Sequence, residues 1–118
     1  MKNEDDKTTS RSSCIPIIES TISIIGGKWS FLVLVQLWVS KKKRFSELQK
    51  SLPKISSKAL TDTLRNLENN GMIIREVFPT VPVTVEYSLS EKGADFQNVL
   101  HAMEVWGEKW GGESIHTN

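Results

Sequence analysis

The sequence predicts a mainly α-helical domain with one small β-hairpin. Two observations lead to this prediction. Over most of the chain, apolar residues recur at spacings of three and four, which is typical of amphipathic helices. Between about residues 72 and 89 the apolar period becomes two, as in half-buried strands, and the helical spacing then returns.

The composition describes a single soluble domain with an uneven charge distribution. The chain has 118 residues, of which 38% are apolar and 25% are charged. Its net charge is only +1, which argues against a protein that coats nucleic acid non-specifically. Residues 41–75, however, carry nine basic and three acidic side chains. This segment therefore has a net charge of +6, and the rest of the chain has a net charge of −5. This distribution indicates a localised basic surface.

The sequence offers no sign of a membrane segment, a metal site or an enzyme. The longest apolar run, 31–35, is too short to cross a bilayer, and residues 1–13 lack the apolar core of a signal peptide. We therefore expect a cytoplasmic protein without membrane contact. Cys14 is the sole cysteine, and neither His101 nor His116 has a neighbour that suggests a catalytic dyad with it. No zinc-ligand spacing or cofactor motif is present.

The N-terminal part divides into a tail and two helices. Residues 1–13 are polar and are predicted to form a flexible tail before the folded domain, 14–110. Pro16 suits the first turn of a helix. Behind it, isoleucines at helical spacing form an apolar stripe: Ile18, Ile22 and Ile25. Two glycines, 26–27, then end this helix, and residues 28–39 form a second helix that should be buried, because it has almost no polar face.

Two further helices are separated by a short turn. Residues 41–44 are predicted to be a solvated basic turn. Ser46 and Gln49 have the spacing of a capping box, which starts a short helix that ends at about Leu52. The next helix spans 56–71, with Ser56 as its N-cap and a glycine at its end. Its buried face is formed by leucines at spacings of four and three: Leu60, Leu64 and Leu67. This pair of helices is a helix-turn-helix arrangement.

A β-hairpin and a last helix complete the domain. Residues 72–77 and 83–89 are the expected strands, and the prolines at 79 and 82 place a stiff loop between them. Ser90 is expected to cap the final helix. This helix carries a long, bulky apolar stripe, which we interpret as a dimer surface shared with Ile18 and Ile22. Its members are Phe96, Val99, Leu100, Met103, Trp106 and Trp110. The alternative is that the stripe packs on its own domain. Residues 111–118 form a C-terminal tail.

This order of elements is that of a winged helix-turn-helix with N- and C-terminal dimerisation helices. Over nearly the whole chain after the tail, the sequence resembles the HxlR-type, MarR-like transcriptional regulators. The matching motifs are Cys14, 25–29 (IGGKW), 44–48 (RFSEL), 60–61 (LT), 64–65 (LR), 67–68 (LE), 71–73 (GMI), 81–82 (VP), 85–89 (VEYSL) and 106–107 (WG). The resemblance implies a homodimer that binds a palindromic operator in double-stranded DNA and represses or activates nearby genes.

The helix 56–71 is the expected recognition helix. If its leucine face packs on the core, five residues point outward: Ser57, Lys58, Thr61, Asp62 and Arg65. Arg65 could pair with guanine, and Lys58 suits a phosphate. Asp62 could accept a hydrogen bond from cytosine or form an ion pair with Arg65 across the helix surface. Additional contacts to the DNA backbone are expected from Lys41, Lys42, Lys43, Arg44 and Lys54. The alternative is a solvated basic face on a winged-helix module that docks a protein or a small ligand.

Two residues bear on how this chain differs from, or adds to, that pattern. The resembling regulators commonly carry a basic wing residue where this chain has Thr84, so we expect the wing to contribute less to DNA binding, with Thr80 and Thr84 touching phosphates.

Some of these regulators sense oxidants or electrophiles through a cysteine at the place of Cys14. At the start of a helix, its thiolate would be favoured by the positive helix end. The alternative is that Cys14 is a small buried apolar residue.

Overall fold

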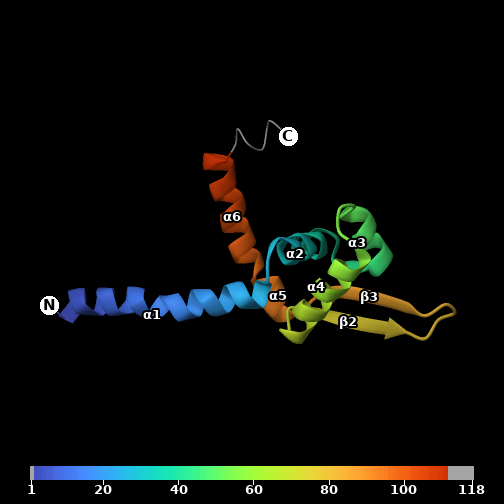
Figure 1. The fold of residues 1–118 in the computed structure, drawn as a ribbon, viewed down its shortest axis with the longest axis horizontal. Coiled ribbons are helices and arrows are strands. Elements are labelled where there is room, and N and C mark those ends of the chain that lie inside the picture. The colour runs from blue at the N-terminus through green and yellow to red at the C-terminus, as the bar shows by residue number, and fades with distance from the viewer. Residues whose placement is uncertain (1, 112–118) are drawn as a thin grey trace.

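The computed structural model describes residues 2–111, with the side chains from residue 13 onward, and it is a helical domain with a small sheet. Figure 1 shows α1 as a long arm on one side, α6 as a second arm, and the β2–β3 hairpin projecting on the opposite side. In chain order the elements are α1 (Lys2–Ile25), α2 (Lys28–Ser40), β1 (Lys42–Arg44), α3 (Phe45–Ser51), α4 (Ser57–Asn69), β2 (Ile73–Phe78), β3 (Thr84–Leu89), α5 (Glu91–Asp95) and α6 (Gln97–Trp110).

The first helix corrects the predicted N-terminal tail. α1 begins at Lys2, so the segment 1–13 is helical from its second residue, and Pro16 lies inside the helix. A polar composition does not exclude a helix that lies on the surface, and residues 2–25 contain no glycine to end one. Pro16 removes one backbone hydrogen bond, but it does not mark where the helix begins. Of the predicted C-terminal tail, 111–118, only Gly111 lies among the described residues.

The central helix is α2, as the apolar composition of 28–39 predicts. It begins after Gly26 and Gly27, whose φ values of 84° and 141° are accessible to glycine at little cost. Its inward face carries Val33, Leu34 and Leu37, each at most 1% exposed. The core around it also includes Ile25, Leu48, Leu60, Leu64, Leu67, Met72, Ile73, Tyr87 and Leu100.

The helix-turn-helix consists of α3 and α4, but the N-cap of α3 differs from the prediction. The cap is Arg44, not Ser46, and its backbone N–H donates to Glu47 Oε1 at 2.8 Å. An arginine side chain has no acceptor, so only the carboxylate half of a capping box forms. The predicted N-cap of α4 is confirmed, because Ser56 Oγ accepts from the backbone N–H of Ala59 at 3.0 Å.

The sheet has three strands where the sequence predicted two. Its order is β1-β3-β2, and both pairs of neighbouring strands are antiparallel. β1 was predicted to be a solvated turn, but Lys43 pairs with Tyr87 of β3, which pairs in turn with Arg75 of β2. Three charged residues have weak strand propensity, so the edge of β3 determines this strand. The Val81–Pro82 peptide bond in the hairpin loop is cis.

The predicted last helix is divided in two at Phe96. Ser90 caps α5 as predicted, accepting from Gly93 N at 3.0 Å. Gly93 is required by close packing, because a Cβ there would lie 2.0 Å from the carbonyl oxygen of Met72. Phe96 turns the chain into α6 and places its ring centroid 6.0 Å from that of Phe31.

Within the described residues, no single helix is long and apolar enough to span a membrane. Residues 13–25 of α1 and the helix α2 meet that length and composition only as a pair, and this pair is bent by 73°.

Candidate nucleic-acid interface

The exposed face of α4 carries the five residues predicted to contact DNA. Leu60, Leu64 and Leu67 are at most 2% exposed and fix the helix on the core. The side chains predicted to contact DNA lie on the opposite, exposed face: Ser57, Lys58, Thr61, Asp62 and Arg65. The amphipathic spacing therefore determines which side of the helix is presented.

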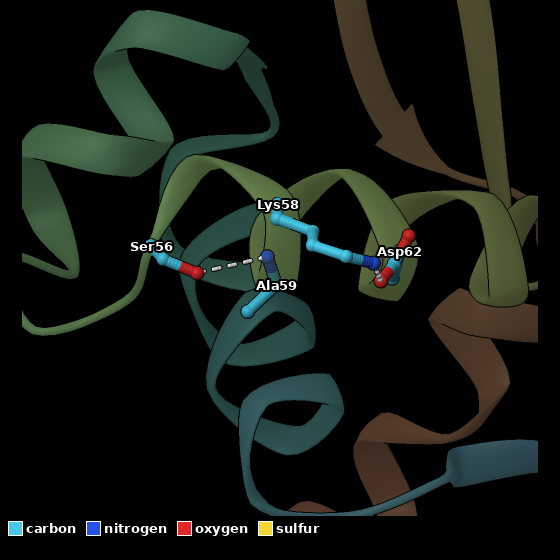
Figure 2. Close-up of polar contacts among 4 residues, drawn as sticks. All are labelled: Ser56, Lys58, Ala59 and Asp62. Atoms are coloured by element: carbon cyan, nitrogen blue, oxygen red, sulfur yellow. Dashed lines mark hydrogen bonds and ion pairs between the residues drawn. The ribbon is translucent and has the colours of Figure 1, made fainter.

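Asp62 pairs with Lys58 and not with Arg65. Lys58 Nζ lies 3.0 Å from Asp62 Oδ2, one helical turn along α4, as Figure 2 shows. The two side chains are 85% and 55% exposed, so the pair is worth little in water and opens easily. Arg65 has no ion-pair partner within the described part of the chain, so its guanidinium is available to an external acceptor.

Ser57 links the two helices of the helix-turn-helix. Gln49 Nε2 donates to Ser57 Oγ at 3.0 Å, and the serine hydroxyl lies 3.3 Å from Gln49 Oε1. Gln49, which the sequence assigned to a capping box, therefore joins α3 to the first turn of α4. This contact helps to fix the angle at which α4 is presented.

The basic residues before α4 are placed differently from one another. Arg44 and Lys54 are exposed, as contacts to a DNA backbone require. Lys43 is half-buried, and its Nζ donates to Ser51 Oγ at 2.7 Å. Lys43 therefore helps to hold β1 against α3, and an external phosphate would have to compete with Ser51 for its ammonium group.

The wing threonines contact each other. Thr80 Oγ1 donates to the carbonyl oxygen of Pro82 at 2.7 Å and lies 2.9 Å from Thr84 Oγ1. Both hydroxyls thus stabilise the hairpin loop. The loop holds no cation, and its two threonine hydroxyls are engaged within it. A weak contact of the wing to DNA stays a prediction.

A polar hollow between α4 and the sheet was not predicted. It has a volume of about 320 Å³ and is lined by Phe45, Thr61, Leu64, Arg65, Glu68, Arg75 and Tyr87. Arg75 and Tyr87 line this hollow but were not among the predicted site residues. They pair directly across β2 and β3, so their side chains lie on the same face of the sheet. The alternation of residues along the two strands is the signal that could have found them.

The apolar stripe predicted for dimerisation is largely exposed in the single chain. Val99, Met103, Trp106 and Trp110 of α6 are 44–67% exposed, and Ile18 and Ile22 of α1 are 53% and 64% exposed. Leu100 differs, because it is only 7% exposed and belongs to the core of its own chain. Phe96 is half-buried against that core.

Cys14 lies in the interior of α1, which corrects the sequence argument about its surroundings. It is roughly three turns beyond Lys2, so the positive helix end is not beside it. The side chain is half-buried. Among the described residues, no three His, Cys, Asp or Glu side chains lie close enough together to hold a metal ion.

Comparisons with known proteins agree with this architecture. Residues 24–115 match the family model of the HxlR-like helix-turn-helix. The chain is 48% identical over 93 residues to YdeP of Bacillus subtilis (strain 168), an uncharacterized HTH-type transcriptional regulator, and the match covers 79% of this chain and 72% of YdeP.

Two solved structures are similar. The redox regulator HypR in its oxidized form has a TM-score of 0.72 and 40% identity, over 78% of this chain and 94% of HypR. Diamide-treated YodB from B. subtilis has a TM-score of 0.68 and 37% identity, over 80% of this chain and 93% of YodB. The chain described here therefore belongs to the HxlR-like helix-turn-helix family of transcriptional regulators, which are not enzymes.

Proposed function

We propose that this regulator acts in the cytoplasm as a homodimer that binds a palindromic operator in double-stranded DNA. The observation that carries the proposal is the geometry of α4. Its leucine face is fixed on the core, and its exposed face presents Lys58, Thr61 and Arg65. The exposed α1 and α6 stripe supports the homodimer, because an apolar surface of this kind on a soluble chain is typical of an interface.

The dimer and the operator are linked by symmetry. Two copies related by a two-fold axis present two α4 helices, which would enter successive major grooves about 34–36 Å apart. Identical helices in opposite orientation read inverted half-sites, so a palindrome is the expected target. Arg65 can form a bidentate contact to guanine O6 and N7, worth about 1–3 kcal/mol of discrimination.

DNA-binding measurements with matched variants test this proposal. The probe is a labelled fragment of the promoter beside the gene, and the readout is fluorescence anisotropy. Arg65→Ala should lose sequence preference, and Lys58→Ala should weaken binding to every sequence about equally. Lys109→Gln, near the end of α6, removes a positive charge away from α4 and is the control for charge. Because Lys109 Nζ lies 5.1 Å from the ring centroid of Trp110, sedimentation velocity must show that this variant is still dimeric. Wild-type binding by both α4 variants would exclude α4 as the reading element.

Salt dependence separates DNA binding from the alternative function. If the basic surface contacts DNA phosphates, the affinity falls steeply as salt rises, because bound counterions are released. A winged-helix module that docks a protein through apolar contacts would show little change. The absence of salt-dependent binding to promoter DNA would favour this second function.

Cys14 is proposed as the site at which an oxidant or electrophile alters DNA binding. The similarity to the redox regulator HypR and to YodB, whose structure has been solved after diamide treatment, supports this. With one cysteine per chain, a disulfide between protein thiols must join two subunits. Two thiols would lose two protons and two electrons to diamide, which becomes the corresponding hydrazine. An electrophilic quinone would instead form one S–C bond.

The test compares the wild type with Cys14→Ser. Diamide should change the affinity of the wild type for the promoter fragment, and reducing agent should restore it. The serine variant should bind the fragment before treatment and should not respond to diamide. An undiminished response in Cys14→Ser would refute this role.

A further inference from the structure

The hollow between α4 and the sheet has features of a binding site. Four elements line it: α3 contributes Phe45, α4 contributes Thr61, Leu64, Arg65 and Glu68, β2 contributes Arg75, and β3 contributes Tyr87. Its two apolar lining residues are Phe45 and Leu64. The hollow of about 320 Å³ is therefore lined mainly by polar and charged side chains, with two apolar ones among them.

Tyr87 provides an unused hydrogen-bonding group in this hollow. The residue is 91% buried, and its hydroxyl makes no hydrogen bond to any residue in the described part of the chain. No buried side-chain oxygen or nitrogen in that part lacks a partner, so the hydroxyl must reach solvent. Tyr87 lines the hollow, which offers its hydroxyl a path to solvent. A buried ring with an accessible hydroxyl is a preorganised donor for an external acceptor.

The charges of the hollow favour a monoanion. Arg65 and Arg75 contribute two positive charges and Glu68 one negative charge, which leaves +1. None of the three has an ion-pair partner within 4.0 Å among the described residues. Guanidinium groups present paired N–H donors that match phosphate oxygens. A phosphodiester carries one negative charge per group and fits this set better than a dianionic phosphate.

The position of the hollow indicates where such a phosphate comes from. In Figure 1, α4 lies across the base of the β2–β3 hairpin. If α4 enters the major groove and the hairpin reaches the adjacent minor groove, the DNA backbone that separates these grooves must pass between them. We infer that the hollow seats one phosphate of that backbone, held by Arg75 and the Tyr87 hydroxyl, while Arg65 adds its positive charge and keeps its proposed contact to guanine. The inference rests on the proposed function, and it supplies the basic contact that Thr84 does not.

Conservative variants test the inference by anisotropy on the promoter fragment and on unrelated DNA. Arg75→Gln should weaken binding to both DNAs by about tenfold and leave their ratio unchanged, since a phosphate contact carries no sequence information. Its plot of log affinity against log salt should be shallower by about one unit. Tyr87→Phe keeps the ring and loses the hydroxyl, so affinity should fall about threefold to tenfold with an unchanged salt slope.

A neutral methylphosphonate, placed in turn at each phosphate of the fragment, locates the contact. At one position it should weaken the wild type but have no further effect on Arg75→Gln. If Arg75→Gln and Tyr87→Phe both keep the affinity and salt slope of the wild type, the inference is overturned. The variant Lys58→Ala distinguishes failure of this inference from failure of the proposed DNA binding. If Lys58→Ala loses affinity while the hollow variants do not, only the phosphate seat fails. Tight binding of inorganic phosphate alone, with no effect of the variants on DNA, would also overturn it.

Discussion

Replacing Trp106 by alanine should separate the proposed dimer without unfolding its subunits. Trp106 is 66% exposed in the single chain, so its indole contributes little to the core. It lies in one row along α6 with Val99, Met103 and Trp110, which are 44–67% exposed. At 100° per residue these four side chains fall within roughly 60° of one another. The row is therefore the face on which a second subunit would bury the most apolar area.

The loss of dimerisation free energy can be estimated from the exposed area of Trp106. A tryptophan buries about 150–250 Å² in a protein interface or core, so 66% exposure leaves roughly 100–165 Å² for a partner. At about 25 cal/mol per Å² this is ~2.5–4 kcal/mol per subunit. Because both subunits of a two-fold dimer carry the substitution, this stabilisation is lost twice. Since ~1.4 kcal/mol is tenfold in Kd, the dissociation constant of the dimer should rise by at least about a thousandfold.

Sedimentation velocity over a range of protein concentrations measures this change, and far-UV circular dichroism confirms that the helices remain. Val105→Ala is the matched control. Val105 is on the same helix and is 50% exposed, but it lies roughly 130° from the centre of the row. It should change the dissociation constant less than tenfold. If Trp106→Ala remains as dimeric as the wild type, or if both variants weaken the dimer equally, the row on α6 is not the interface.

Three further predictions concern the fold around α4. Ser56→Ala should lower the free energy of unfolding by about 1 kcal/mol in urea, whereas Ser46→Ala should be neutral; equal effects would contradict the observed caps. Gly93→Ala should cost at least about 3 kcal/mol, because its Cβ would lie 2.0 Å from a backbone oxygen; an unchanged melting temperature would refute this. Asn66→Ala should cost about 1 kcal/mol and accelerate amide exchange at the end of α1; unaltered exchange there would argue against this hydrogen bond.

The sequence predicted α4 well because every signal for it is local. Ser56 lies where an N-cap is needed, and the leucine spacing identifies the buried face. A helix whose boundaries and orientation depend on its own residues can be derived without a structure. The same spacing identifies its outward side chains, whereas the pairing of Asp62 with Lys58 depends on side-chain conformations that the spacing does not specify.

The features that were missed depend on residues far apart in the chain. β1 exists because 42–44 pair with the edge of β3, more than forty residues later, and its basic composition gives no local sign of a strand. The hollow likewise needs Arg65, Arg75 and Tyr87 to be brought together by the packing of α4 on the sheet. For α1, a local signal was present but was misinterpreted, because Pro16 is tolerated inside the helix.

The contacts of α1 bear on how chemistry at Cys14 could reach the DNA. α1 joins α2 through Gly26 and Gly27, whose φ values lie where glycine is favoured. The direct link to α4 is Asn66, whose Nδ2 donates to the carbonyl oxygen of Ile24 at 3.2 Å. A rotation of α1 would therefore act directly on the third turn of α4. Because α4 also forms one wall of the hollow, such a movement would alter groove contact and phosphate contact together.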